Sequence, residues 1–291
     1  MKKVMITGVS GFIGCHLVSE LVKQGYYVVG VDKRPYPKEY PDMNEFIQTD
    51  VFDLGFRDLM DIDYVIHLAF ITNIPNSVRH PVKTTYQNID MTVHLLQMCK
   101  EAGVKRLLFP STVSLYANNP IPWTEDMTPE PIEPYSWQKM SCEYLCKMYD
   151  IDTIIFRFFQ VFGSNQRPDT ALAYFLKAKE DDKPITLTKT SVHAGFKSGQ
   201  RDFVYVGDLA KAVILAMEKG KNNEIYNVAS GDVTTMEEIA KTIGAKIEWI
   251  PRRDWEVERH EGDISKLKAL GWKPETKIIP WLKEYVKHNK K

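Results

Sequence analysis

The hydrophobic positions of this chain follow two patterns that alternate along the sequence. Short runs rich in β-branched and aromatic residues are each followed by a longer segment in which apolar residues recur at helical spacing. The short runs predict strands at 3–7, 27–32, 45–50, 63–69, 106–112 and 153–159. The longer segments predict helices at about 12–24, 83–101 and 136–149. Strands that alternate with helices in this way predict an α/β fold with a doubly wound parallel sheet.

The regular alternation of predicted strands and helices ends after about residue 163. A loop-rich stretch comes first, and the pattern then predicts helices at 169–180, 206–220, 234–244 and 280–288 and a strand at 224–230. The chain has 291 residues, a length that suits one large or two ordinary domains. We therefore expect a second, smaller α/β region after the parallel sheet.

Composition and charge exclude several classes of protein. Hydrophobic residues are 44% and charged residues 26% of the chain, and no apolar run is long enough to span a membrane. Lysine plus arginine equals aspartate plus glutamate, 38 against 38, so no overall charge attracts nucleic acid or an anionic membrane. We expect neither as a partner. The four cysteines lack the spacing of metal ligands, so we expect no metal, and free thiols fit a cytoplasmic protein.

A glycine-rich turn directly follows the first predicted strand. Gly8, Gly11 and Gly14 let the backbone approach a pyrophosphate closely and leave the N-terminus of the next helix free to bind it. Asp32 ends the second predicted strand, where a carboxylate hydrogen-bonds the ribose 2′-hydroxyl of NAD. The pattern therefore predicts a Rossmann-like sheet that binds NAD. The lysine and arginine that follow Asp32 leave NADP open as an alternative, because they could attract its 2′-phosphate.

A tyrosine and a lysine lie one helical turn apart at the start of a predicted helix. Tyr135 and Lys139 project from one face, where an ammonium stabilises phenolate. Together with the positive charge of a nicotinamide ring, it is expected to lower the tyrosine pKa toward neutrality and make Tyr135 a general base. Ser111 and Thr112 end a strand, and hydroxyls there point into the ligand crevice of a parallel sheet. His67, at the end of another strand, is expected to be a satisfied core histidine.

These segments resemble the extended short-chain dehydrogenase/reductases, in the NAD-dependent epimerase/dehydratase family that acts on nucleotide sugars. The resemblance runs through nearly the whole chain. It is carried by TGVSGFIG at 7–14, TDV at 49–51, HLA at 67–69, STVSLYA at 111–117, YSWQK at 135–139, RFFQVFG at 157–163, RDFVYVGDLA at 201–210, NVASG at 227–231 and DISKLKALGWKP at 263–274.

The resemblance implies a role for each matching residue. Thr112, Tyr135 and Lys139 take the places of the catalytic residues. The residues implied in NAD binding are Gly8, Gly11, Phe12, Ile13, Gly14, Asp32, Asp50, Val51, Leu68, Ala69, Asn88, Tyr135 and Lys139. Those implied in substrate binding are Thr112, Gln160, Arg167, Arg201 and Arg253, the last two as ligands of the substrate diphosphate. The implied domains are an NAD-binding part, 1–162 plus about 201–228, and a nucleotide-sugar-binding part, about 163–200 plus 229–291.

Two residues after Thr112 bear on the type of reaction. Relatives that are 4,6-dehydratases carry adjacent Asp and Glu there, and relatives that epimerise carbons 3 and 5 use a cysteine at the first position. This chain has Val113 and Ser114, and neither side chain can act as a strong acid or as a carboxylate base. We therefore expect 4-epimerisation of a UDP- or dTDP-hexose or uronate through a transient 4-keto intermediate. A nucleotide-sugar reductase or dehydrogenase is the alternative, whereas a non-catalytic NAD-binding regulator would not need the catalytic set.

The sequence leaves the sugar and the assembly open. Gln160 stands where many relatives have Asn or Thr in contact with the substrate. The segment NQRPDTA at 165–171 is similar to one in UDP-glucuronate 4-epimerases, whose arginine contacts the sugar carboxylate and corresponds to Arg167. The same motif occurs in relatives with neutral sugars, so both classes remain. Family members often form homodimers through helices equivalent to 83–101 and 136–149, whose apolar residues suit either an interface or a core.

Overall fold

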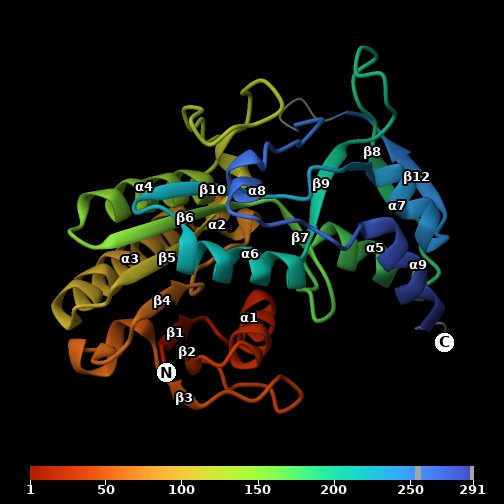
Figure 1. Cartoon of the computed structure of the whole chain (residues 1–291). Coiled ribbons are helices and arrows are strands. Elements are labelled where there is room, and N and C mark those ends of the chain that lie inside the picture. The colour runs from red at the N-terminus through yellow and green to blue at the C-terminus, as the bar shows by residue number, and fades with distance from the viewer. Residues whose placement is uncertain (253–256, 289–291) are drawn as a thin grey trace.

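The central strands bury side chains on both faces, which explains their nearly continuous apolar runs. Val4 and Ile6 of the first strand pack into one core, with residues of the first helix, whereas Met5 between them packs into a second core on the other face. Strands of this kind belong to parallel sheets that helices cover on both sides. Figure 1 shows the resulting layers.

The computed structural model describes residues 1–252 and 257–288. The strands are β1 (Lys3–Thr7), β2 (Tyr27–Asp32), β3 (Glu45–Gln48), β4 (Tyr64–His67), β5 (Arg106–Thr112), β6 (Asp152–Phe158), β7 (Gln160–Phe162), β8 (Ile185–Thr188), β9 (Gln200–Tyr205), β10 (Glu224–Val228), β11 (Val233–Thr235) and β12 (Ile247–Ile250). The helices are α1 (Phe12–Lys23), α2 (Ile74–Arg79), α3 (Pro81–Ala102), α4 (Pro134–Met148), α5 (Ala171–Glu180), α6 (Val206–Lys219), α7 (Met236–Ile243), α8 (Ser265–Ala269) and α9 (Ile278–His288), with short 3-10 turns η1 (Val51–Asp53), η2 (Phe56–Leu59) and η3 (Val113–Leu115).

Seven strands form one parallel sheet in the order β10-β6-β5-β4-β1-β2-β3. The chain runs outward from β1 to β3 and then returns to β4 on the other side of β1. The strand order therefore reverses between β1 and β4, and ligands of such sheets bind outside the carboxyl ends of the strands at that point. The Rossmann-like α/β fold expected from the sequence is confirmed.

Two smaller sheets lie in the later part of the chain. β9 pairs with β7 in parallel and with β11 in antiparallel orientation, and β8 pairs with β12. A third apolar core joins α5, α7 and α9 to β7, β8 and β9. Every helix and strand expected from the sequence is present within two residues of its expected ends. The strands of the small sheets and the short helices α2 and α8 were not expected, because three to six residues are too few to show a period.

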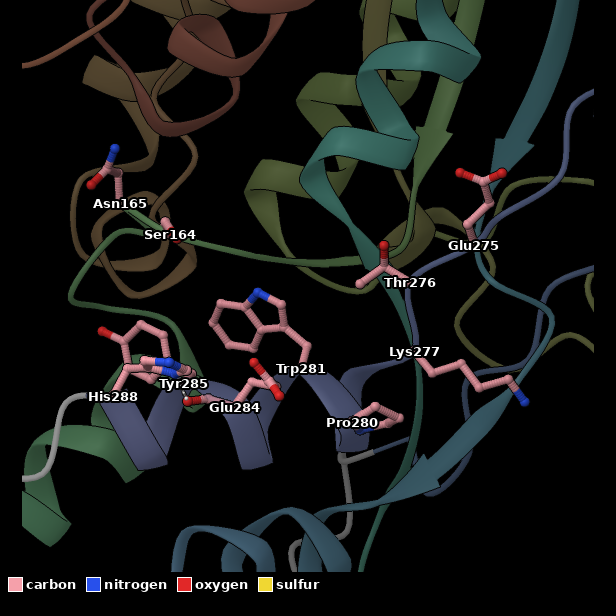
Figure 2. Close-up of a pocket in the computed structure, with 10 residues that line it drawn as sticks. All are labelled: Ser164, Asn165, Glu275, Thr276, Lys277, Pro280, Trp281, Glu284, Tyr285 and His288. Atoms are coloured by element: carbon pink, nitrogen blue, oxygen red, sulfur yellow. Dashed lines mark hydrogen bonds between the residues drawn. The ribbon is translucent and has the colours of Figure 1, made fainter.

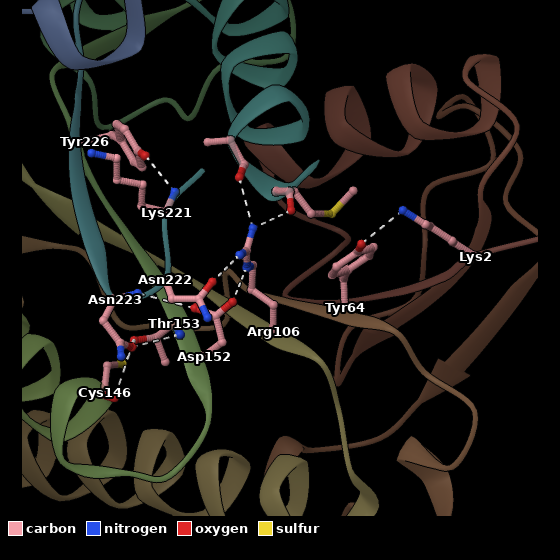
Figure 3. Close-up of polar contacts among 12 residues, drawn as sticks. Lys2, Tyr64, Arg106, Cys146, Asp152, Thr153, Lys221, Asn222, Asn223 and Tyr226 are labelled. Atoms are coloured by element: carbon pink, nitrogen blue, oxygen red, sulfur yellow. Dashed lines mark hydrogen bonds and ion pairs between the residues drawn. The ribbon is translucent and has the colours of Figure 1, made fainter. Parts of the chain in front are cut away.

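A partly buried arginine connects the sheet to α6 at the edge opposite the ligand crevice. Arg106 begins β5, and its guanidinium pairs with Asp152 of β6 at 2.6 Å and donates to the carbonyl O of Met217 at 2.7 Å, near the end of α6. Its remaining amine donates to Asn222 in the loop before β10 (Figure 3). These bonds tie β5, β6, α6 and β10 together and so hold the far ends of the strands that carry the candidate site.

Candidate functional site

Backbone segments approach very closely where the strand order reverses. Gly8 follows β1 with a φ of 72°, and a Cβ there would lie 2.6 Å from the backbone N of Ala69, just after β4. A Cβ on Gly14 would lie 2.4 Å from the carbonyl O of Val9, so this glycine lets α1 pack on the turn. Gly11 precedes α1, and no side chain caps that helix. The first N–H groups of α1 are therefore available to an anion such as a pyrophosphate.

A cavity of about 800 Å³ runs along these strand ends. Its walls contain all the non-catalytic residues expected to bind NAD, namely Gly8, Gly11, Phe12, Ile13, Gly14, Asp32, Asp50, Val51, Leu68, Ala69 and Asn88. The glycine turn lies at the helix N-terminus, which suits phosphates, and the carboxylate of Asp32 lies at the end of β2, which suits a ribose. The residues present therefore fit NAD.

Asp32 uses its carboxylate to organise the end of the cavity near β2. Its oxygens accept hydrogen bonds from the backbone N of Ser10 at 3.1 Å and of Arg34 at 2.9 Å. The guanidinium of Arg34 pairs with the same carboxylate at 3.3 Å, and Lys33 lies 3.6 Å from Asp50. Both cations that could hold the phosphate of NADP are thus paired with carboxylates, which favours NAD.

We expect NADP to bind at least about tenfold more weakly than NAD, because its 2′-phosphate would approach the Asp32 carboxylate. Titration of the purified protein with each cofactor, followed by quenching of tryptophan fluorescence, gives the two dissociation constants. The Asp32→Ser variant removes the repulsion and releases Arg34, so its preference should move toward NADP. Equal dissociation constants in the unchanged protein would show that the Arg34 charge outweighs the Asp32 charge.

Two buried polar side chains lie at or near the ends of the central strands, and one of them, Asn88, lines the cavity. Asn88 accepts from the backbone N of Ile71 at 2.8 Å and donates to Gln138 at 2.7 Å, so its amide fixes the loop after β4. His67 bonds to Thr7 at 2.8 Å and, more weakly, to a second threonine at 3.3 Å, and burial lowers its pKa to about 3. His67 is therefore neutral and satisfied, as the sequence suggested.

The three expected catalytic side chains come from β5 and α4. Thr112 is the last residue of β5, and Tyr135 and Lys139 are buried on one face of α4. Glu133 caps α4 by accepting from two backbone N–H groups, one of them that of Tyr135 at 2.7 Å. Burial raises the pKa of Tyr135 to about 12, although its bond with Thr112 opposes this rise. The shift is opposite to the lowering expected from the sequence, because burial outweighs the neighbouring charges and the expectation also included the charge of a bound nicotinamide.

Lys139 lies in an aromatic enclosure. Its Nζ donates to the carbonyl O of Pro110 at 2.6 Å and lies 3.5 Å from the ring centroid of Phe70 and 4.6 Å from that of Phe109. Burial lowers its pKa to about 7. Phe70 also meets Tyr135 edge to face at 6.1 Å and lines the NAD cavity. Phe70 therefore contacts both members of the catalytic pair and places them next to the NAD cavity. The sequence reasoning missed it, and the available signal was its position directly after HLA at the end of β4.

The two positions after Thr112 hold no ionisable group. Val113 is buried in the core, and Ser114 accepts a hydrogen bond from the Thr112 hydroxyl at 3.2 Å. The backbone N of Ser114 also donates to Thr112 at 3.2 Å, which fixes the threonine rotamer at the end of β5. The local chemistry is therefore that of neutral hydroxyls beside the tyrosine.

The structure describes all the residues expected to bind substrate except Arg253, which lies outside the described residues. Gln160 comes two residues after Phe158, and Phe158 pairs with Thr112 across β5 and β6, so Gln160 and Thr112 share one edge of the sheet. Arg201 is the second residue of β9, and its guanidinium donates to the carbonyl O of Glu258 at 3.2 Å.

Arg167 lies in the wall of the NAD cavity. Its guanidinium forms a two-point ion pair with Asp169, at 2.9 Å and 2.6 Å, and donates to Thr72. Its positive charge lowers the pKa of Tyr135 slightly against the effect of burial. Arg167 therefore lies near the catalytic tyrosine, but its own charge is balanced by Asp169.

Several buried side-chain oxygens of the described residues have no hydrogen-bond partner, and some of them belong to residues at or near the candidate site. In the described part of the chain, the buried side-chain oxygens without a hydrogen-bond partner belong to Ser111, Gln160, Gln166 and Gln200. Ser111 lies near the end of β5, Gln160 follows β6, and Gln166 lines the NAD cavity. Buried polar atoms are normally paired, so these oxygens are the expected contact points of a bound ligand.

A second hollow, of about 960 Å³, lies beside α9 and contains none of the expected site residues (Figure 2). Trp281 and Tyr285 stack there at a centroid distance of 4.9 Å. Within the described residues, no three metal-ligating side chains cluster, and no helix has the length and apolar character needed to cross a membrane.

Comparison with known proteins assigns the chain to a family. The model of the NAD dependent epimerase/dehydratase family matches residues 4–229. The chain belongs to this family. The expectations of an enzyme of epimerase type with NAD as its cofactor are thereby confirmed at the family level.

Members of the family with assigned activities resemble the chain over almost its full length. A UDP-glucuronate 4-epimerase of Thermodesulfobacterium geofontis is 31% identical and aligns over 100% of this chain and 97% of the relative. The structure of the Thermus thermophilus UDP-glucose 4-epimerase with NAD has a TM-score of 0.85 at 29% identity and covers 98% of each chain. A dTDP-D-glucose 4,6-dehydratase of Mus musculus is 27% identical over 96% of this chain and 85% of the relative. Family membership therefore includes more than one reaction.

Proposed function

We propose that the protein is an NAD-dependent nucleotide-sugar 4-epimerase that acts on a UDP- or dTDP-sugar. The observation that carries this proposal is the set Thr112, Tyr135 and Lys139 beside the NAD cavity, with Val113 and Ser114 where a dehydratase needs an acid and a base. Two of the relatives named above are 4-epimerases of UDP-sugars, which supports the same reaction.

Each side chain of the set has one task in this mechanism. Tyr135 removes the proton of the sugar 4-hydroxyl and later returns it, and Thr112 donates a hydrogen bond to the reacting oxygen. Lys139 supplies positive charge that favours the phenolate and binds the nicotinamide ribose. Bound NAD supplies reversible hydride transfer at the sugar carbon. Arg201 and Arg253 would hold the substrate diphosphate, so that the sugar would be free to turn in the site.

The decisive experiment incubates the purified enzyme and NAD with UDP- and dTDP-sugars. We expect conversion to the 4-epimer, resolved by chromatography, with no net change in the absorbance of reduced nicotinamide. Stoichiometric production or loss of that absorbance would instead identify a dehydrogenase or reductase. Release of water with formation of a 4-keto-6-deoxy sugar would identify a dehydratase.

The domain division expected from the sequence belongs to the same proposal. Residues 1–162 with about 201–228 would bind NAD, and about 163–200 with 229–291 would bind the nucleotide sugar. The seven-stranded sheet and the third apolar core support two such parts, although β9 pairs with β7 and β11 and not with the main sheet.

We further propose a homodimer formed through α3 and α4. These helices pack together, and each leaves large apolar side chains on the surface. The exposed residues are Val82, Tyr86, Trp137, Tyr144 and Met148. Large exposed apolar side chains on two helices that pack together suit a self-complementary interface.

Tyr144→Glu is expected to convert the dimer to a monomer, because it introduces a charge among these apolar side chains. Multi-angle light scattering during gel filtration measures the change as a halving of mass, with NAD binding retained. Val192→Glu is the matched control, since Val192 is even more exposed but lies in the loop between β8 and β9. A monomeric unchanged protein would contradict the proposed assembly.

A further inference from the structure

Gln160 and His260 meet at the edge of the sheet although they lie 100 positions apart in the chain. The amide Nε2 of Gln160 donates to Nδ1 of His260 at 3.0 Å. The amide oxygen at the other end of Gln160 is buried without a partner. Since Gln160 follows the strand that pairs with Thr112, the residue that carries this oxygen lies at the same edge of the sheet as Thr112.

His260 is held firmly in the position where it accepts this bond. Its backbone N donates to the carbonyl O of Gln200 at 3.0 Å, and its ring packs against Trp123 at a centroid distance of 5.2 Å. Trp123 is itself buried and stacked on Tyr116. Burial and the nearby charge of Arg201 hold the pKa of His260 well below its usual range. The ring is therefore neutral, and its Nδ1 remains able to accept.

We propose that His260 determines the sugar specificity of the enzyme by orienting Gln160. Because His260 takes the N–H end of the Gln160 amide, the end that remains for the substrate is a hydrogen-bond acceptor. An acceptor binds a sugar hydroxyl, but it repels a carboxylate and leaves that charge unpaired at a buried position. The preferred substrate class is therefore a nucleotide-linked neutral hexose and not a hexuronate. This inference rests on the proposed function, since it concerns the sugar at the same site.

The state of Arg167 supports the same preference. A site for a hexuronate needs a cation that is free to meet the carboxylate, and Arg167 is the arginine that the sequence offers for this role. The guanidinium of Arg167 already donates to both carboxylate oxygens of Asp169, from Nε at 2.9 Å and from Nη2 at 2.6 Å. A bound carboxylate would have to displace Asp169 from this two-point pair.

The test measures binding and turnover of UDP-hexose and UDP-hexuronate of the same configuration by the NAD-loaded protein. We expect the unchanged protein to bind the hexose at least about tenfold more tightly, the range of one lost hydrogen bond at a buried site. His260→Leu removes the acceptor that orients Gln160, so the ratio of the two dissociation constants should fall toward one. His260→Asn offers an oxygen near the position of Nδ1 and should restore the ratio. If His260 had only a structural role, His260→Leu would weaken the binding of both sugars equally.

Gln160→Met provides a second variant if His260→Leu does not fold, because it removes the amide and leaves His260 in place. It should also abolish the preference, while NAD binding reports that the fold is intact. Tighter binding of the hexuronate, or an unchanged ratio of the two dissociation constants in Gln160→Met, would overturn the inference. If either sugar were still converted to its 4-epimer, the proposed function would stand. A preference for the hexose in binding without any epimerisation would uphold the inference and reject the proposed function. Absence of binding by both sugars would reject both.

Discussion

Tyr135→Phe is expected to lower kcat by at least about a hundredfold, the lower range for a positioned general acid or base. The variant loses one oxygen, and with it the only group in the proposed mechanism that removes and returns the proton. The ring that meets Phe70 edge to face remains, so packing on α4 should be preserved. The dissociation constant of NAD should therefore change by no more than about twofold. Steady-state epimerisation and fluorescence titration measure the two quantities on the same preparation.

Tyr144→Phe is the matched control for this result. It makes the same chemical change on the same helix, but at a side chain that is exposed in the single chain and is not among the residues that line the cavity. Its kcat should equal that of the unchanged protein. Near-normal turnover in Tyr135→Phe would remove Tyr135 from its proposed role and would leave Thr112 or a bound water as the proton acceptor.

Arg157→Met is expected to lower the free energy of unfolding by about 3–5 kcal/mol, the cost of leaving one buried charge without its partner. Arg157 lies on β6 and forms a two-point pair with Glu143 of α4, at 3.1 Å and 2.8 Å, with both side chains at most 4% exposed. Glu143 lies one turn after Lys139 on α4. The loss should therefore extend to the position of the helix that carries Tyr135 and Lys139.

Urea denaturation measures this effect, and a double variant separates charge from shape. Arg157→Met combined with Glu143→Leu removes both charges, so most of the stability should return. Lys177→Met breaks an exposed ion pair on α5 and should leave the transition almost unchanged. If the double variant were as unstable as Arg157→Met, the contribution of Arg157 would come from its packing on Tyr116 and not from its pairing.

Local signals in the sequence predicted the sheet and most of the NAD cavity. The glycine turn and Asp32 lie within one βαβ unit, where spacing alone determines their relative positions, and Tyr135 and Lys139 lie on one turn of a helix. Phe70 could not be assigned a role, because its contact with Lys139 depends on how β4 and α4 pack across the sheet. His260 is farther still from its partner in sequence, and no pattern indicates that it bonds to Gln160.

The Tyr135 pKa shows a second limit of reasoning from the sequence. The sequence indicates which charged residues lie near Tyr135, but it does not indicate how deeply a side chain is buried. Burial is the largest cause of the pKa shift at both Tyr135 and Lys139. The direction of a pKa shift in a closed crevice therefore follows from packing, which becomes visible only in three dimensions.

The close approach of Gly8 to Ala69 has a consequence for building chimeras of this enzyme. The end of β1 and the loop after β4 are joined by two bonds to Thr7, from Leu68 at 3.0 Å and from Ala69 at 3.3 Å, and no Cβ fits on Gly8 between them. A crossover anywhere between 14 and 67 would take these two segments from different parents. Exchanges with other members of the family should therefore keep the two segments from one parent, so that they are inherited together although they are distant in the gene.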